Sequence, residues 1–395
     1  MRANLKTFKS GNGDCVFLRL LDDKAYYNIM IDCGVFTKEI KNYIETTLHS
    51  HINLLIATHI DYDHIDGLCN MLKRLPNLQI DKILFNCYQR LNGKQIVEMT
   101  AEVKSDIIKL TGNLPRQVVD NEGKINMEHA SCLASLIMSN ANWNNAWTRD
   151  YIHKDSEPLV LGGRFGKLVI LSPLVEDIYI LDDEFAREYM RLTKHKAVGI
   201  PFSGQETLYE LVLRLVSMKK KEREYINQQK KASALIEKYS EIVWQSALAF
   251  KPRGISDENR ASIAFVWEYD DNKILFMGDA EPDIIKDSIT DKYGKLSDCK
   301  AIKISHHGSK HSTSVDLLKV VDSSDYFITG GNESDKPSIE AFSKIVNRDD
   351  NKHRTIHYNY ERNELMKDME SQELLEYRIK YNFNISSINE LEFEY

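Results

Sequence analysis

A chain of 395 residues with 42% hydrophobic residues is long enough to bury a large core and to form two or three structural lobes. No run of about 18 apolar residues is present and Met1-Arg2-Ala3-Asn4 starts no signal-peptide core, so we expect a soluble, cytoplasmic protein without a membrane partner. The net charge of −7 argues against a strongly basic nucleic-acid-binding protein, but it excludes neither a local basic groove nor positive charge supplied by metal ions.

The cysteines show no CxxC spacing, which predicts reduced thiols in a cytosolic protein rather than a disulfide framework or a zinc ribbon. Cys33 and Cys69 do not lie at metal-ligand positions of the motifs described below. We therefore expect the thiols to be small, partly buried side chains.

The first elements along the chain predict the start of a sheet. Residues 8–15 form a glycine-rich turn, and the apolar run 28–31 ends in Asp32-Cys33-Gly34. The next apolar run, 53–58, predicts a short buried strand, and a helical pattern begins at Ile65.

Between that strand and that helix lies the hexapeptide His59-Ile60-Asp61-Tyr62-Asp63-His64. Two imidazoles and two carboxylates on one tight turn can converge on one or two hard-to-borderline divalent ions. The alternative, a solvated polar loop, needs no further ligands elsewhere in the chain. The motif therefore predicts a metal site only if later strands supply more ligands.

The middle of the chain changes character. Residues 167–172 read as a strand that Pro173 ends. Residues 207–216 are amphipathic at helical spacing, 219–231 are strongly polar, and 234–250 are again apolar at helical spacing. This pattern predicts an inserted helical hairpin over 174–257, either a lid or partner-binding arm or a solvated surface bundle.

Two later strands deliver further ligand-type residues. The run 273–277 leads into Gly278-Asp279, and 301–304 leads into Ser305-His306-His307-Gly308-Ser309. Strands that present such residues at their ends are what a layered α/β site requires. The tail after Glu361 is charged and helix-like to Tyr377 and strand-like to Tyr395.

The ordered set of these motifs resembles the metallo-β-lactamase superfamily, closest to the soluble hydrolase domain of the ComEC competence protein. The resemblance covers 1–173 and 258–360. It implies a four-layer αββα sandwich with a first αβ half at 1–173, the helical insertion at 174–257, a second αβ half at 258–360 and a C-terminal extension at 361–395.

The resemblance also implies roles for the ligands. Asp279 would bridge two ions, His59 and Asp61 would bind one of them, and Asp63, His64 and His306 would bind the other, the ions being zinc or manganese. His306 is preferred to His307, the second choice, which is also a candidate proton donor. Asp63 and His307 are the expected catalytic residues.

The chain departs from the superfamily pattern in two places. Asp61 stands where many members have a second histidine, which favours harder ions such as Mn²⁺. The usual further histidine of the first ion is not evident, because the expected strand ends in Ser172-Pro173; His129, His153 and His195 lie in the right interval but lack a strand-end setting.

The expected substrate is anionic. Ser309, Lys310, Ser312 and Thr313 place hydroxyls and a cation after the histidines, and Lys336 stands where relatives often have a histidine before Pro337-Ser338. These groups favour a phosphodiester, attacked by a metal-bound hydroxide. The resemblance points to DNA or another nucleotide polymer, and to the effector of a bacterial defence operon.

Two alternatives stay open. The same ions would hydrolyse a carbonyl ester, lactone or amide without needing Lys310 or Lys336. The missing histidine also leaves room for a catalytically weak metal-binding protein that acts on a protein partner through the helical insertion.

Overall fold

Two sheets, packed face to face, form the centre of the protein in a computed structural model. The structure describes residues 1–87, 122–148, 150–193, 201–203, 206–207, 249–250, 254–330, 337–348, 350–360 and 378–395. The first sheet runs in the order β18 (Glu390–Glu394), β1 (Arg2–Thr7), β2 (Val16–Leu21), β3 (Tyr26–Ile31), β4 (His51–Ala57) and β5 (Gln79–Phe85).

The second sheet runs in the order β17 (Phe383–Ser386), β16 (Arg354–Tyr358), β15 (Asp325–Ile328), β13 (Ala301–Lys303), β11 (Asn272–Phe276), β10 (Ala264–Tyr269), β7 (Lys167–Ser172) and β6 (Leu159–Val160). Its strands from β17 to β11 are parallel, and the remaining pairs are antiparallel. In the first sheet β3, β4 and β5 are parallel neighbours.

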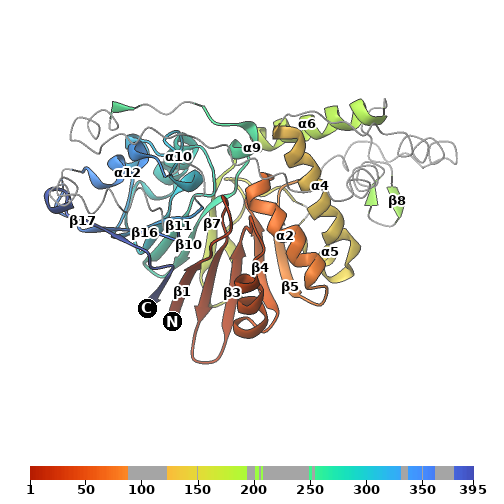
Figure 1. The fold of residues 1–395 in the computed structure, drawn as a ribbon, viewed down its shortest axis with the longest axis horizontal. Coiled ribbons are helices and arrows are strands. Elements are labelled where there is room, and N and C mark those ends of the chain that lie inside the picture. The colour runs from red at the N-terminus through yellow and green to blue at the C-terminus, as the bar shows by residue number, and fades with distance from the viewer. Residues whose placement is uncertain are drawn as a thin grey trace.

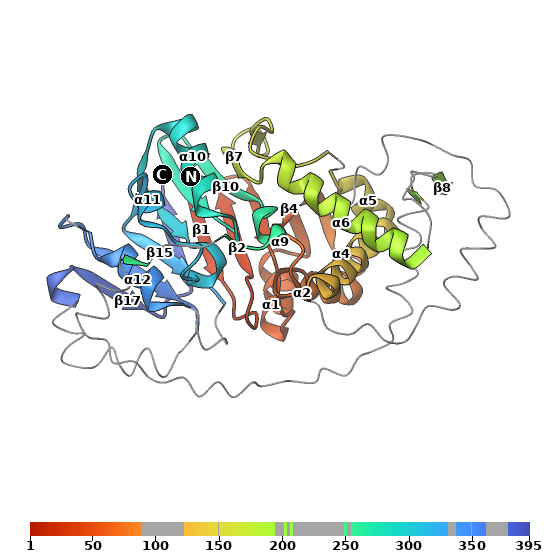
Figure 2. The same ribbon diagram turned by 90° about the horizontal axis from the view of Figure 1, so that it is seen from above.

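Helices cover the outer face of each sheet. The helices α1 (Lys38–Asn42), α2 (Tyr62–Arg74), α4 (Glu122–Ser139) and α5 (Ala141–Ala146), with a π-helical turn at Tyr43–Thr47, lie on the first sheet. The helices α10 (Pro282–Tyr293), α11 (Val315–Leu318) and α12 (Ile339–Val346) lie on the second. Figures 1 and 2 show α2, α4 and α5 on one side of the sheets and α12 on the other.

The alternation of apolar side chains along the strands explains this layering. In β4, Leu54 and Ile56 pack between the sheets, whereas Leu55 and Ala57 pack against the helices. Successive side chains of a strand point to opposite faces, so a continuous apolar run is a strand covered on both sides. The expected αββα sandwich is confirmed.

The tail of the chain completes both sheets. β17 is an edge strand of the second sheet, and β18 pairs antiparallel with β1 as an edge of the first. The terminal amino group donates a hydrogen bond to the carbonyl of Tyr395 at 2.7 Å, and Figure 1 shows the two termini side by side. The strands β6 and β7, within the expected first half, belong to the second sheet.

The expected helical insertion opens with α6 (Val175–Thr193) and closes with α9 (Asp257–Arg260). A two-stranded ribbon, β8 (Pro201–Ser203) and β9 (Glu206–Thr207), lies between them. The predicted helices at 207–216 and 234–250 lie outside the described residues, apart from Thr207 and residues 249–250.

Among the described residues, no helix is long and apolar enough to cross a membrane. The cysteines are free thiols, as expected; Cys132 is partly exposed and the other five are buried.

Candidate metal centre

The strand ends of both sheets meet at one place. The backbone N–H of Ile263, just before β10, donates to the carbonyl of Thr58 after β4 at 2.8 Å, which joins the two sheets there. Asp279 follows β11, and the neighbouring parallel strand β13 leads into the turn that carries His306 and His307. The N–H of His306 donates to the carbonyl of Gly278 at 3.0 Å, so the two loops are tied together.

The hexapeptide spans a loop and a helix. The sequence pattern placed the helix start at Ile65, but α2 begins at Tyr62, with Asp61 as its extended N-cap residue. Asp63 and His64 therefore project from the first helical turn, where unpaired backbone N–H groups favour a negative charge. The prediction of a turn holding all four side chains was wrong at this boundary.

The carboxylate of Asp279 lies at the centre of four imidazoles. Its Oδ2 atom is 3.4 Å from Nε2 of His64, 3.7 Å from that of His306, and 3.9 Å from those of His59 and His307. Ligand atoms about 2.1 Å from a tetrahedral ion are about 3.4 Å apart, so these separations are close to those of ligands that share an ion.

Three groups of ligand atoms, each within 4.8 Å of one another, contain His64; one of them joins it to Asp14 and Asp32, and two others include further residues of the hexapeptide. Of these two, one joins His59, His64 and Asp279, and the other joins Asp63, His64 and His307. The Oδ2 atoms of Asp61 and Asp63 lie 3.5 Å from Nε2 of His59 and 3.4 Å from Nε2 of His307, respectively. Both adjacent histidines thus face the centre, and it is His307 that groups with Asp63.

Hydrogen bonds to Nδ1 fix which nitrogen of each ring faces the centre. His64 Nδ1 donates to Asp32 Oδ2 at 2.8 Å. Thr58 Oγ1 donates its proton to the same Asp32 oxygen at 2.7 Å, so it accepts from His59 Nδ1 at 3.0 Å. His307 Nδ1 donates to the Thr329 carbonyl at 2.9 Å. An imidazole protonated at Nδ1 presents a lone pair at Nε2, as a metal ligand must.

Those lone pairs have no hydrogen-bond partner in the part of the chain that the structure describes. Nε2 of His59, His64 and His307 and Oδ1 of Asp279 are buried and accept no hydrogen bond from any described residue. A buried polar atom without a partner costs about 1–3 kcal/mol, so three such nitrogens around one carboxylate are unstable unless something binds them. Neutral imidazoles and carboxylates are ligands of zinc and manganese, and the residues fit such an ion.

The pKa shifts of the clustered side chains also indicate that the site binds positive charge. Burial alone would raise the pKa of Asp279, but His64 and His306 lower it well below its ordinary range. Burial lowers the pKa of the imidazoles, yet Asp279 and Asp32 raise the pKa of His64 well above its ordinary value, and Asp14 and Asp279 raise the pKa of His307 to about 9. Without an ion the carboxylates therefore favour a proton on these rings, and a bound cation would supply the positive charge in its place.

Three residues of the site have strained backbone conformations. His306, His307 and Asp32 have φ values of 50°, 54° and 55°, in the left-handed region that side chains with a Cβ seldom adopt. Such residues cost about 1–3 kcal/mol each and persist where the surroundings determine their conformation. The 3₁₀ turn Ser305–Gly308 is thus held in a shape that turns both imidazoles toward Asp279.

Two glycines allow the N-terminal turns to approach α2. A Cβ on Gly13 or on Gly34 would overlap the carbonyl oxygen of Asp63. These turns therefore fix the backbone that carries the Asp63 ligand, and no larger residue fits without moving it.

Replacing Gly13 by alanine will displace the first turn of α2. We expect the Gly13→Ala variant to bind zinc at least about tenfold more weakly, because shifted ligands lose the geometry that the ion requires. Competition with a chromophoric chelator measures this. Gly254→Ala is the control, because a Cβ there meets no atom within 4 Å and its φ, like that of Gly13, lies outside the left-handed region. Equal zinc affinity in both variants would contradict this role of Gly13.

The expected substrate residues are placed as follows. Ser309 is buried, and its Oγ accepts from the His311 N–H at 3.4 Å. Lys310 Nζ lies 5.6 Å from the ring centre of Phe250. Ser312 Oγ lies 3.2 Å from His306 Nδ1, so this hydroxyl orients a candidate ligand. Lys336 lies outside the described residues.

Two of the histidines considered as the additional ligand of the first ion are described, and both make other contacts. His129, on α4, lies 3.6 Å from Asp66 and packs edge-on against Tyr62. His153 lies in a loop beside Asp155, and His195 is outside the described residues. Within the described part of the chain, neither His129 nor His153 joins a candidate metal group.

The sequence interpretation missed several residues that support the ligands. Asp32 and Thr58 orient two histidines, and Ser262 Oγ accepts from the Asp279 N–H at 3.0 Å while lying 3.4 Å from His59 Nδ1. Asp32 could have been found, because it follows a strand just as the ligands do. Ser262 gave no such signal, since only folding brings it to His59.

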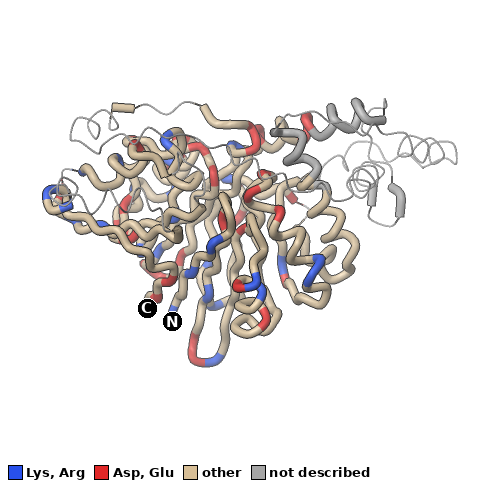
Figure 3. Tube along the Cα trace, viewed as in Figure 1, with Lys and Arg blue, Asp and Glu red and all other residues tan. Residues whose placement is uncertain are grey.

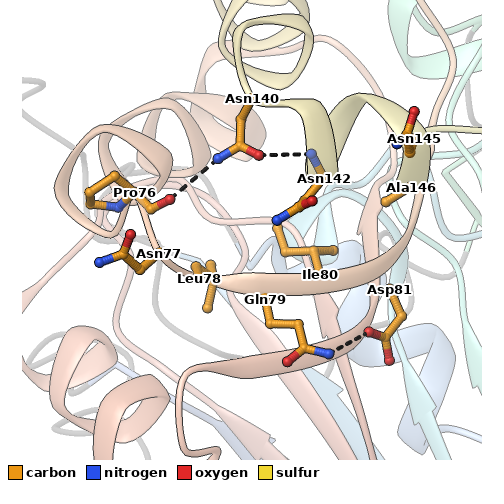
Figure 4. A pocket seen from close by; sticks show the side chains of 10 residues that line it. All are labelled: Pro76, Asn77, Leu78, Gln79, Ile80, Asp81, Asn140, Asn142, Asn145 and Ala146. Carbon is orange, nitrogen blue, oxygen red and sulfur yellow. Dashed lines mark hydrogen bonds between the residues drawn. The ribbon is translucent and has the colours of Figure 1, made fainter.

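A separate cavity of about 730 Å³ lies far along the first sheet from these strand ends, between β5 and α5. Figure 4 shows its polar wall, in which the Asn140 amide caps α5 and donates to the Pro76 carbonyl at 3.3 Å. These amides stabilise the local turns, and the cavity contains none of the candidate ligands. Its lining residues are Pro76, Asn77, Leu78, Gln79, Ile80, Asp81, Asn140, Asn142, Asn145 and Ala146.

Comparisons with known proteins add little. No protein-family model matches the chain, and no curated protein matches it. The structure is similar to the metallo-β-lactamase fold protein YhfI from Bacillus subtilis, with 7% identity over 99% of each chain and a TM-score of 0.34. This similarity is too low to support a function. The ComEC resemblance stays a prediction, and the fold and the site rest on the geometry above.

Proposed function

We propose that the protein is a metal-dependent hydrolase whose substrate is an anionic phosphodiester. The observation that carries the proposal is the set of buried Nε2 atoms of His59, His64 and His307 around the Asp279 carboxylate, which have no hydrogen-bond partner among the described residues. Such a constellation requires cations, and imidazole–carboxylate sites that hold divalent ions serve hydrolysis in many proteins.

The proposed ligand roles follow from the positions of the side chains. His64, which belongs to both ligand groups, and Asp279, buried between the histidines, would join the two groups, with His59 and Asp61 on one side and Asp63 and His307 on the other. When bound, divalent ions lower the pKa of a coordinated water and stabilise negative charge on the group under attack.

Asp63 is the proposed proton acceptor. Its side chain is 28% exposed, against 2% for Asp279, so it faces the side from which substrate arrives. Burial raises its pKa, but His64 and His307 lower it well below the ordinary range, so the carboxylate is ionised but a weak base, and the proposed role rests on its position.

The phosphodiester part of the proposal rests on Lys310. The lysine follows the histidine turn by two residues and carries the positive charge that a phosphate oxygen needs. Over the described chain, lysines and arginines are interspersed with acidic residues (Figure 3). We therefore extend the proposal to a DNA or nucleotide substrate held at its scissile phosphate, rather than to a duplex bound along a basic surface.

Replacing Lys310 by alanine tests the substrate class. We expect KM for a chromogenic phosphodiester to rise about tenfold and its salt dependence to flatten, while hydrolysis of a neutral ester stays within about twofold. Lys319→Ala is the control, because Lys319 is exposed and pairs with Asp316 on α11. Equal losses on both substrates would indicate a structural role for Lys310, and faster hydrolysis of neutral esters by the parent protein would overturn the phosphodiester assignment.

A further inference from the structure

A second aspartate, Asp14, does for His307 what Asp32 does for His64, and the two carboxylates lie close together. Asp14 lies in the turn between β1 and β2, fully buried, and its Oδ1 is 3.2 Å from Nδ1 of His307. The Thr329 hydroxyl donates to the same carboxylate oxygen. The His307 N–H thus faces two acceptors, the Asp14 carboxylate and the Thr329 carbonyl, so its proton is held at Nδ1.

Asp14 has its own counter-charge. Lys303, the last residue of β13, is 3% exposed and forms an ion pair with the second carboxylate oxygen of Asp14. Lys303 Nζ also donates to the carbonyl of Gly278 at 3.4 Å, directly before Asp279. The lysine therefore connects the N-terminal turn of the first sheet with the ligand loop of the second.

The charges explain why a lysine is buried there. Burial lowers the pKa of Lys303, but Asp14 and Asp279 raise it above its ordinary value, so the side chain is cationic. Burial would likewise raise the pKa of Asp14, yet Lys303 and His307 lower it well below its usual range. A buried ion pair of this kind gains little net stability over apolar packing, so its retention beside a ligand histidine calls for a role.

We infer that Asp14 is a positioning residue of the metal centre. It holds the His307 ring with Nε2 directed at the metal, and Lys303 compensates its charge while fixing the Gly278–Asp279 backbone. This inference rests on the proposed metal-binding function. It adds a residue pair that touches neither the substrate nor the ion and acts through His307 and Asp279.

The test separates positioning from stability. We expect Asp14→Asn to weaken Zn²⁺ binding by about 10- to 100-fold, as loss of a ligand's hydrogen-bonded carboxylate does in metalloproteins. It will also lower Tm, because Lys303 is left buried without its counter-charge. In the double variant Asp14→Asn/Lys303→Met the uncompensated charge is gone, so Tm should recover, whereas the affinity for Zn²⁺ should stay low.

The matched control is another buried cation between carboxylates. Arg354 is 1% exposed and lies 2.8 Å from both Asp322 and Asp350 on the far part of the second sheet. Arg354→Met should lower Tm without changing the affinity for Zn²⁺. Both quantities are measured on the full chain, by chelator competition after removal of bound metal and by thermal unfolding of the metal-free protein.

Three results would overturn the inference in different ways. If the double variant regained Zn²⁺ affinity together with Tm, Asp14 would serve stability alone. If the parent chain itself bound no Zn²⁺, the proposed metal-binding function would be wrong, and the positioning role would be wrong as well. Parent-like affinity in Asp14→Asn would remove the role of Asp14 while leaving the proposed function intact.

Discussion

Replacing Asp279 by alanine will remove metal binding and hydrolysis together. The carboxylate lies within 3.9 Å of Nε2 of four histidines, so its loss removes the anion that these four imidazoles share. We expect the variant to retain less than about a tenth of the metal bound by the parent and to lose about 10³-fold or more in kcat/KM, since the ions contribute several kcal/mol to catalysis.

The control for this variant is Asp283→Asn. Asp283 follows on α10, has a side chain that is 66% exposed, and pairs with Lys286 at the surface. Metal content and activity should match the parent in this variant. Metal retained at parental stoichiometry by Asp279→Ala would exclude Asp279 as the central ligand.

Asp63→Ala will separate catalysis from folding. The variant loses a group that lies 3.4 Å from His307 Nε2 and that we assign as proton acceptor. We expect kcat to fall by about 10²- to 10⁴-fold, the range typical of general acid–base groups, with a smaller loss of bound metal than in Asp279→Ala. Activity is measured with metal in excess and folding by near-UV circular dichroism.

Asp66→Ala is the matched control on the same helix. Asp66 lies one turn further along α2 and faces His129 rather than the centre, so its removal should change kcat by less than about threefold. Full activity in the metal-saturated Asp63→Ala variant would move the chemistry to another group.

The strand ends were predictable because they follow from local pattern. Continuous apolar runs marked β4, β11 and β13, and ligand-type residues stood directly after each of them. Since the carboxyl ends of neighbouring parallel strands meet at one edge, the meeting of Asp279 with the His306-His307 turn follows from the sequence, whereas the approach of His64 from the other sheet does not.

The groups that orient the ligands were not predictable in the same way. Thr329 and Lys303 act on residues far away in the chain, and which of His306 or His307 lies beside Asp63 depends on the left-handed backbone of their turn. Side-chain chemistry alone treats the two histidines as equivalent. The place of β6 and β7 in the second sheet likewise follows from long-range pairing, not from local propensity.

The most direct test of the proposed function is the metal stoichiometry of the purified protein measured together with its activity. After removal of bound metal with a chelator and titration with Zn²⁺ or Mn²⁺, elemental analysis should find one to two equivalents per chain, and hydrolysis of a chromogenic phosphodiester should rise in parallel with occupancy. If the parent chain bound no more metal than Asp279→Ala, or if activity did not depend on occupancy, the proposed function would be wrong.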